Sequence, residues 1–147
     1  MKKYKKLMAS EAATQHAALC YRPTTTGQCE ILLITSRDTG RWVLPKGWPK
    51  KNEPGGETAM REAYEEAGVK GKLMKGCVGV FDYDKVLSPG SAIPCCVAVH
   101  AIKTTHMDDD FPEKDERTRA WFTPREAAKA VAEPELQRLL ESFTPEG

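Results

Sequence analysis

The sequence lacks several features by which protein classes are commonly recognised. Its five cysteines are odd in number and contain no C-x-x-C pair, which argues against a disulfide framework and a structural zinc site and fits a reducing compartment. No apolar run approaches the length of a membrane span, and none of signal-peptide length follows the basic start of the chain. Neither sign of charge dominates, because the formal net charge is only +1. We therefore expect a cytoplasmic protein that binds neither nucleic acid nor a membrane, and the composition leaves its oligomeric state open.

The chain also lacks internal repeats, low-complexity segments and any linker that would divide it. Its 147 residues are enough to bury the core of one compact domain, and 40% apolar with 29% charged residues is an ordinary soluble balance. We expect a flexible basic N-terminus over residues 1–12 and a single domain over residues 13–147.

Strand-like and helix-like segments together predict the fold class. Short apolar runs bounded by turn residues predict strands over residues 17–21, 31–34, 42–44, 73–81 and 95–102. Residues 45–56 form a loop rich in proline and glycine, and a helix over residues 58–67 ends at Gly68, which is typical of a C-cap. Two further helices begin at the capping box of Thr123 and at Pro134. Strands mixed with three helices predict an α+β fold, an α/β/α sandwich.

The helix over residues 58–67 carries three carboxylates on one face. At 100° per residue, Glu62, Glu65 and Glu66 fall within an arc of roughly 100°. Such neighbours repel one another by a few tenths of a kcal/mol per pair. A solvated acidic face accounts for the pattern taken alone. A hard divalent cation would reverse the cost, because Mg²⁺ prefers oxygen ligands.

The loop before this helix concentrates positive charge. Its prolines and glycines allow backbone amides and carbonyls to approach an ion or a phosphate closely. Five cations lie within fifteen residues in and before the loop: Arg37, Arg41, Lys46, Lys50 and Lys51. Groups that bind cations and groups that bind anions side by side predict a site for a metal–diphosphate complex.

The spacing of these residues resembles the Nudix box, written G-x5-E-x7-R-E-U-x-E-E-x-G-U with U aliphatic. All seven fixed identities are present: Gly47, Glu53, Arg61, Glu62, Glu65, Glu66 and Gly68. Ala63 and Val69 fill the two aliphatic positions. Chance would produce this match on the order of once in 10⁸ windows. The chain is therefore similar to the Nudix hydrolases, whose fold is a mixed β-sheet between helices with the box as a loop–helix–loop.

The resemblance implies a metal site and a reaction. Glu62 and Glu66 would ligate Mg²⁺, with Mn²⁺ as a possible substitute, and the backbone carbonyl near Lys46 and Gly47 would complete the coordination. Glu65 would be either a further ligand or the base that deprotonates the attacking water. The reaction is the attack of water on a diphosphate phosphorus, with the metal neutralising charge and lowering the pKa of bound water.

The resemblance also implies supporting residues, while charge and position near the loop indicate the substrate-binding ones. Arg61 would orient the glutamates through a salt bridge, and Glu53 would support the loop. The five cations of the loop would bind substrate phosphates. Trp48 would either stack on a nucleobase or pin the loop to the core.

Outside the box, residues 16–140 resemble the diphosphoinositol polyphosphate phosphohydrolases. Those enzymes have a run of glycines where this chain has Lys46-Gly47-Trp48, and basic residues where it has Thr14-Gln15-His16. A dinucleoside polyphosphate is therefore favoured over a diphosphoinositol polyphosphate as substrate. ADP-ribose or nucleoside triphosphate hydrolysis and a non-catalytic nucleotide sensor remain alternatives.

The histidines and an acidic run complete the candidate residues. His16, His100 and His106 are not grouped in the sequence and predict no histidine-based mechanism. The acidic run over residues 108–116 is typical of a solvated loop, and one of its carboxylates is an alternative further metal ligand.

Overall fold

The computed structural model describes residues 14–145, without the side chains of residues 86 and 87. The expected flexible segment over residues 1–12 and the domain boundary at residue 13 lie outside the described residues. In chain order, the elements are β1 (Thr14–Pro23), β2 (Cys29–Thr35), β3 (Trp42–Val43), β4 (Lys46–Gly47), α2 (Gly55–Ala67), β5 (Val69–Ser88), β6 (Ser91–Met107), β7 (Arg119–Phe122), α3 (Pro124–Ala130) and α4 (Pro134–Ser142).

The strands form one mixed sheet in the order β3-β2-β1-β6-β5, with β4 beside β1 and β7 beside β2. β1 pairs in parallel with β6, while the remaining pairs are antiparallel. Residues 17–21 of β1 are all buried. A strand that is apolar on both sides needs cover on both faces of its sheet. The structure thus confirms the predicted α+β class with a mixed sheet.

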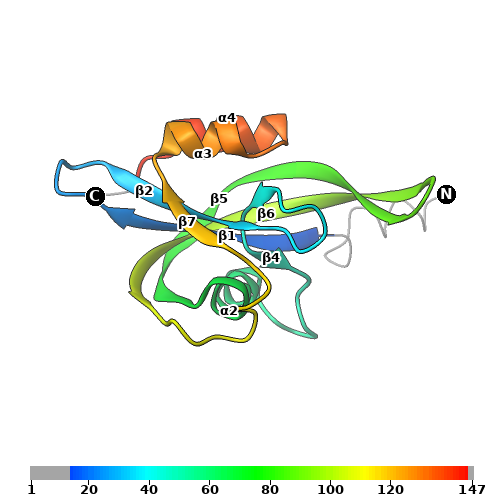
Figure 1. Ribbon diagram of the computed structural model, residues 1–147, viewed down its shortest axis with the longest axis horizontal. Helices are drawn as coiled ribbons and strands as arrows, with labels where there is room; N and C mark the ends of the chain where they lie inside the picture. The colour runs from blue at the N-terminus through cyan, green and yellow to red at the C-terminus, as the bar shows by residue number, and fades with distance from the viewer. Residues whose placement is uncertain (1–13, 146–147) are drawn as a thin grey trace.

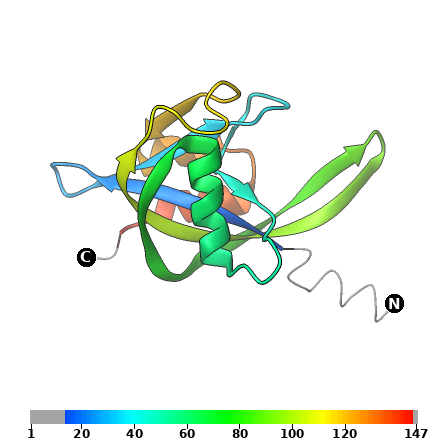
Figure 2. The same ribbon diagram turned by 90° about the horizontal axis from the view of Figure 1, so that it is seen from below.

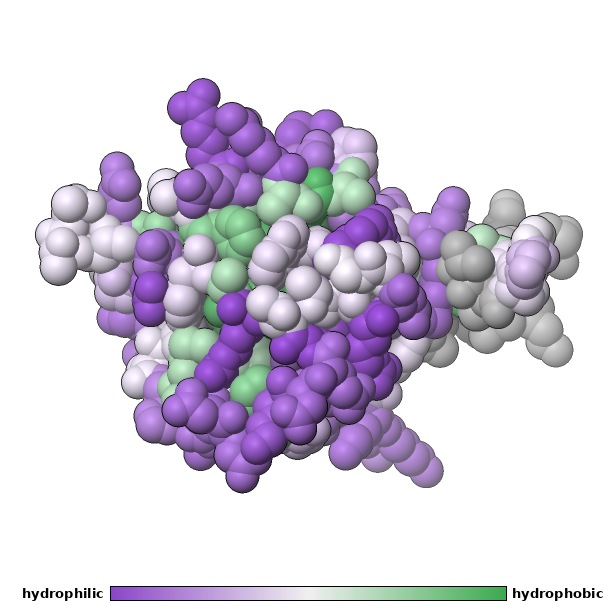
Figure 3. All heavy atoms as spheres, in the orientation of Figure 1, coloured by the Kyte–Doolittle hydropathy of each residue, from purple (hydrophilic) through white to green (hydrophobic). Residues whose placement is uncertain are grey.

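Helices supply this cover. α2 lies against one face of the sheet, and α3 and α4 lie against the other (Figure 1). On the α2 side, Ala59, Ala63 and Ala67 pack against Ala18 and Leu32 of the central strands. These small side chains let the helix axis approach the sheet closely, so the opposite face of α2 is left for polar residues. Figure 3 shows mainly hydrophilic residues over α2 and the loops around it.

The ends of the helices agree with the sequence patterns. Gly68 adopts φ 70°, and its N–H donates to the carbonyl oxygens of Ala63 and Tyr64. This left-handed conformation favours glycine and ends the helix as predicted. The Thr123 capping box is also present, with Glu126 at its third position. Helix α2 begins at Gly55, three residues before the predicted start, because Pro54 takes an extended conformation that suits an N-cap.

β5 and β6 extend well beyond the strands predicted at residues 73–81 and 95–102. They form one long antiparallel hairpin whose distal half projects away from the sheet (Figure 2). β5 contains four register irregularities, including those between Leu73 and Cys77 and between Cys77 and Gly79. Bulges break the period-two alternation that marks a strand in a sequence. The other two irregularities, between Lys70 and Gly71 and between Val86 and Ser88, lie outside residues 73–81 and interrupt the alternation near both ends of β5.

The parallel pairing of β1 with β6 corrects one interpretation. His16 and His100 are 84 residues apart in sequence, yet their ring nitrogens lie 3.0 Å apart on the α2 side of the sheet. They are therefore grouped, although His106 is not part of the pair. Within residues 14–145, no helix is long and apolar enough to cross a membrane.

Candidate active site

The three glutamates of α2 differ in exposure. Glu66 is buried at 7% exposure, the side chain of Glu62 is 12% exposed, and that of Glu65 is 36% exposed. Glu62 and Glu66 are one helical turn apart and lie next to each other. Glu65 is the most exposed of the three. The structure therefore separates two enclosed carboxylates from one that solvent reaches.

Glu66 is enclosed by the neighbouring loop. The backbone N–H of Lys46 donates to its Oε1 at 3.3 Å, and Nη2 of Arg117 lies 3.8 Å from its Oε2. Burial raises the pKa of Glu66 well above its ordinary value, and the hydrogen bond with Glu62 raises it further, while Arg117 opposes both. Two adjacent carboxylates in such a place need positive charge beside them to be ionised together.

Gly47 brings the backbone of β4 against these carboxylates. β4 pairs with β1, with Gly47 opposite His16. A β-carbon at Gly47 would overlap the carboxylate of Glu62. The approach of β4 to α2 in this conformation therefore requires a residue without a side chain, and it places the backbone of Gly47 next to the carboxylate of Glu62.

This donor set fits a hard divalent cation. Glu62, Glu66 and the backbone near Gly47 offer oxygen atoms, which Mg²⁺ and Mn²⁺ prefer. Among the described residues, no three histidine, cysteine, aspartate or glutamate side chains are grouped closely enough to hold a metal by themselves. Two carboxylates with a carbonyl suit Mg²⁺ in particular, because it usually keeps several waters and substrate phosphates as its other ligands.

Arg61 holds the carboxylate of Glu62 and the preceding loop in a fixed relative position. Its Nη1 lies 2.8 Å from Glu62 and 3.6 Å from Glu65. Its Nη2 donates to the carbonyl oxygen of Trp48 at 3.1 Å, and the guanidinium also binds Glu53 through Nε at 2.9 Å and Nη2 at 2.8 Å. One side chain thus joins the helix to the preceding loop.

Glu53 completes this connection. Besides Arg61, its carboxylate accepts from the backbone N–H of Lys50 at 3.0 Å and from the hydroxyl of Thr58 at 2.8 Å. Arg61 and the Lys50 amide hold the pKa of Glu53 well below its usual range. We call Arg61, Glu53 and these partners the Arg61 brace.

The carboxylates open into a cleft with a volume of about 450 Å³. Six of the residues predicted from the sequence line it: Arg37, Lys46, Gly47, Trp48, Glu62 and Glu66. Glu53, Arg61 and Glu65 are not among the lining residues: Glu53 and Arg61 belong to the brace, and Glu65 lies 3.6 Å from Arg61. Arg41, Lys50 and Lys51 are exposed and are not among the lining residues.

Comparison with known proteins identifies this arrangement. The model of the NUDIX domain matches residues 14–143 of the chain. The chain belongs to the Nudix family. Nudix hydrolases generally use divalent metal ions, in agreement with the oxygen donors at the cleft.

Curated Nudix relatives are moderately similar in sequence. "Nudix hydrolase 12, mitochondrial" of Arabidopsis thaliana is 36% identical over 120 residues, which cover 78% of this chain and 58% of the relative. "Diphosphoinositol polyphosphate phosphohydrolase 3-alpha" of Homo sapiens is 35% identical over 118 residues, which cover 78% of this chain and 66% of the human protein. The alignments thus span 58% and 66% of the lengths of these two relatives.

Solved Nudix structures share the fold. An Ap4A hydrolase of C. elegans superposes with a TM-score of 0.65 at 22% identity, over 88% of this chain and 94% of that chain. The E. coli dihydroneopterin triphosphate pyrophosphohydrolase gives a TM-score of 0.65 at 16% identity, over 90% of this chain and 94% of that chain. These matches show the Nudix fold alone.

The cleft also contains residues that the sequence did not indicate. Lys85 reaches it from β5, Arg117 from the loop before β7, and Gln15 from the start of β1. Period-two alternation of Phe81, Tyr83 and Lys85 was the available signal for Lys85, because it places all three on one face of an extended strand. No local pattern marks Arg117.

The acidic run contacts both α2 and the cations of the cleft. The backbone N–H of Glu113 donates to the carbonyl oxygen of Glu65 at 3.0 Å, and its carboxylate binds Nε of Arg117 at 2.8 Å. Asp108 instead accepts from the hydroxyl of Tyr64 at 3.0 Å. Glu113 and Glu116 thus each pair with a cation of the cleft, Arg117 and Arg37 respectively, and a metal-ligand role for a carboxylate of this run stays a prediction.

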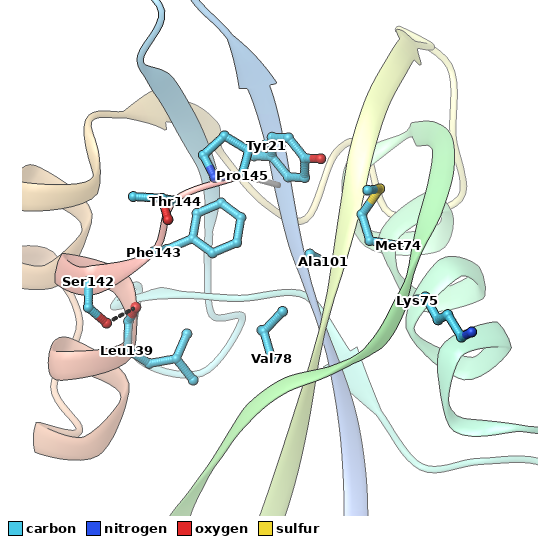
Figure 4. Close-up of a pocket in the computed structure, with 10 residues that line it drawn as sticks. All are labelled: Tyr21, Met74, Lys75, Val78, Ala101, Leu139, Ser142, Phe143, Thr144 and Pro145. Carbon is cyan, nitrogen blue, oxygen red and sulfur yellow. Dashed lines mark hydrogen bonds between the residues drawn. The ribbon is translucent and has the colours of Figure 1, made fainter. Parts of the chain in front are cut away.

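A second pocket, of about 270 Å³, lies between α4 and the strands β5, β6 and β1 (Figure 4). It shares no lining residue with the cleft. Tyr21, Met74, Leu139 and Phe143 give it an apolar wall, and Lys75 is its one lysine or arginine among the described residues. Phosphates are better accommodated in the cleft, where glutamates, lysines and arginines converge.

Proposed function

We propose that this protein is a Mg²⁺-dependent pyrophosphohydrolase that cleaves a diphosphate bond within an extended phosphate chain. The observation that carries the proposal is the convergence of Glu62 and Glu66 with the backbone of Gly47 in a cleft that also contains cations. Carboxylates and cations side by side suit a substrate that arrives as a complex of metal and phosphate. A non-catalytic sensor would have no need for buried, adjacent carboxylates.

Each group of residues has a separate task in this mechanism. Glu62 and Glu66 would hold the metal, and Arg61 keeps Glu62 oriented toward it. Bound there, Mg²⁺ would neutralise charge on the diphosphate and lower the pKa of an attacking water. Glu65 is the exposed carboxylate of the three and would accept the proton of that water. The cations of the cleft would hold the phosphates in line for attack.

We favour a dinucleoside polyphosphate as substrate, ahead of a diphosphoinositol polyphosphate. Both carry long phosphate chains, and the human relative named for diphosphoinositol polyphosphates is 35% identical. In this chain, Gln15 lines the cleft at the start of β1, where a cation would help to bind a highly phosphorylated ring. Trp48, which also lines the cleft, offers an aromatic face on which a nucleobase can stack.

A substrate panel tests the assignment. The full chain is assayed with diadenosine penta- and hexaphosphate, a diphosphoinositol polyphosphate, ADP-ribose and nucleoside triphosphates. We expect the highest kcat/KM for a long phosphate chain, full activity with Mg²⁺ or Mn²⁺ and none in excess EDTA. ADP-ribose or a nucleoside triphosphate as best substrate would overturn the substrate assignment. Full activity in EDTA would overturn the mechanism.

Glu66→Gln tests the metal site itself. The variant should lose several orders of magnitude in kcat, because stabilisation of transition-state charge is worth several kcal/mol. Without metal it should be no less stable than wild type, because it removes a buried carboxylate next to Glu62. Mg²⁺ should stabilise wild type more than the variant. Glu57→Gln, an exposed position in the first turn of α2, is the matched control. Equal Mg²⁺-induced shifts in all three proteins would contradict a metal site at Glu66.

A further inference from the structure

Four cationic residues of the described part of the chain line the cleft, and only its two arginines form close ion pairs with carboxylates of the acidic run. Arg37 and Arg117 each pair with a carboxylate of the acidic run, at 2.9 Å and 2.8 Å. Among the described residues, no ion pair joins Lys46 or Lys85 to a carboxylate, although both line the same cleft. The charges of Glu66 and Glu133 act on Lys46 from a longer distance, so within residues 14–145 neither ammonium group is held in a direct ion pair and both can contact a ligand in the cleft.

The side chain of Lys46 is held in place by aromatic and polar neighbours. Its Nζ lies 5.0 Å from the centre of the Tyr83 ring, a cation–π contact. The Tyr83 hydroxyl donates to Oε1 of Gln15 at 2.5 Å, and Gln15 is only 4% exposed. Because Gln15 is fixed by burial, the ring is fixed as well. Lys46 is thus oriented before any ligand binds.

Lys85 approaches from the projecting hairpin. It follows Tyr83 by two residues on β5, so both side chains lie on the same face of the strand. Lys46 comes from β4, immediately before Gly47 of the proposed metal site. The two lysines therefore reach the cleft from different elements, and they lie beside the carboxylates where a diphosphate would be cut.

We propose that Lys46 and Lys85 form a subsite for the phosphates beyond the scissile diphosphate, and that this lysine subsite sets the preference for long phosphate chains. The inference rests on the proposed function and names the residues that determine its specificity. A chain of phosphates supplies one negative charge after another, which matches two separated cations. Each additional phosphate could form a charge-assisted hydrogen bond with one of the lysines, so the affinity would rise with chain length. Lysine suits this task because its flexible stem accepts phosphates at varied positions.

Binding of inorganic polyphosphates tests the subsite without any turnover. Titration calorimetry in EDTA measures the Kd of tripolyphosphate and of pyrophosphate for wild type and for Lys85→Met. We expect the substitution to weaken tripolyphosphate binding about tenfold, equivalent to about 1.4 kcal/mol, and pyrophosphate binding much less. Lys72→Met, an exposed lysine on the same strand, is the control and should leave both affinities unchanged.

A double-mutant cycle tests how Lys46 is positioned. Tyr83→Leu should weaken tripolyphosphate binding severalfold in the wild-type background, because it removes the ring that holds the ammonium. In the Lys46→Met background it should have no further effect, since the group it positions is gone. Tyr83→Phe, which keeps the ring, should restore most of the affinity. Equal losses in both backgrounds would show that Tyr83 acts only through general stability.

The outcomes separate the subsite from the proposed function. If Lys85→Met weakens both anions equally or neither, or if wild type does not bind tripolyphosphate, the lysine subsite is wrong even though the enzyme hydrolyses its panel. If the chain-length effect on binding is present but no panel compound is hydrolysed, the subsite stands and the proposed function fails.

Discussion

Arg61 and Lys46 are partly buried cationic residues next to the same pair of carboxylates, and their surroundings differ. Arg61 meets Glu53, Glu62 and the carbonyl oxygen of Trp48 through short hydrogen bonds. Lys46 meets the face of Tyr83 instead. Burial lowers the pKa of the Lys46 amine, with Lys85 adding to this and Glu66 opposing it. The guanidinium of Arg61 is hydrogen-bonded within the protein, whereas the ammonium of Lys46 can form its hydrogen bonds with a ligand.

Arg61 therefore belongs to the framework of the site, and Lys46 belongs to the residues that contact a ligand. The guanidinium is planar, so Arg61 holds two elements in one geometry by bidentate contacts. The brace therefore fixes the loop and the glutamates before substrate arrives. Lys46 contributes nothing comparable to the fold, because a cation–π contact is worth about 0.5–1 kcal/mol at exposed sites and about 2 when desolvated. Substitutions in the two regions should consequently have different signatures.

The largest effect is expected from breaking the brace. Arg61→Leu should lower kcat at least a hundredfold and destabilise the fold by roughly 3 kcal/mol, because Glu53 and Glu62 would remain enclosed without their partner. Arg61→Lys should recover little, since an ammonium cannot reproduce the bidentate contact. Urea unfolding and steady-state kinetics measure the two effects. Arg138→Leu, at an exposed position on α4, should stay within about 0.5 kcal/mol of wild type.

A wild-type unfolding curve for Arg61→Leu would show that the contacts at 2.8–3.1 Å do not hold the loop. A loss of stability with unchanged kcat would show that the glutamates keep their orientation without it. Either result would remove the contrast with Lys46.

The next effect concerns Glu53 and depends on pH. Its folded pKa is depressed, chiefly by Arg61, so its contribution to stability is full above the unfolded value of about 4.3 and is lost as the pH falls below it. Glu53→Gln should therefore be less stable than wild type by about 1–2 kcal/mol at pH 7. The gap between the two proteins should narrow as the pH falls from 5 toward 2. Thermal unfolding across that range measures it, and a gap independent of pH would assign the loss to packing rather than to charge.

The sequence predicts the brace far better than the lysine subsite, for a physical reason. Gly47, Glu53, Arg61 and Glu62 lie in one loop and the helix that follows it, so they form a contiguous motif, and its resemblance to the Nudix box implied the roles of Arg61 and Glu53. Local signals also predicted Gly68 as the helix end, and the structure confirms it. Motifs contained within one loop and one helix are therefore recoverable from the sequence alone.

The lysine subsite depends on tertiary pairing. Lys85 reaches the cleft because β5 continues past Phe81 in unbroken register with β6, beyond the strand predicted over residues 73–81. Arg117 reaches it because Thr118 and Thr35 exchange hydrogen bonds between loop and strand, at 3.0 Å and 2.9 Å. The contact of His16 with His100 arises in the same way, from a parallel strand pair. None of these neighbours is close in sequence, so no spacing rule could have joined them.

The smallest effect is expected at Lys50 and Lys51, which were predicted from the sequence to bind substrate. Both are exposed and lie outside the cleft lining, so they would act on a long phosphate chain through a screened field rather than by direct contact. Lys50→Ala combined with Lys51→Ala should raise KM for a diadenosine hexaphosphate about twofold at low salt, more than for a short substrate, with kcat unchanged. The difference should vanish above about 0.3 M salt, where the Debye length is well below its value of about 10 Å at 0.1 M. The loss caused by Lys85→Met should persist at that salt because its contact is direct. A salt-resistant effect at Lys50 and Lys51, equal to that of Lys85, would place the phosphate chain along the outer loop and overturn the distinction between the two sets of lysines.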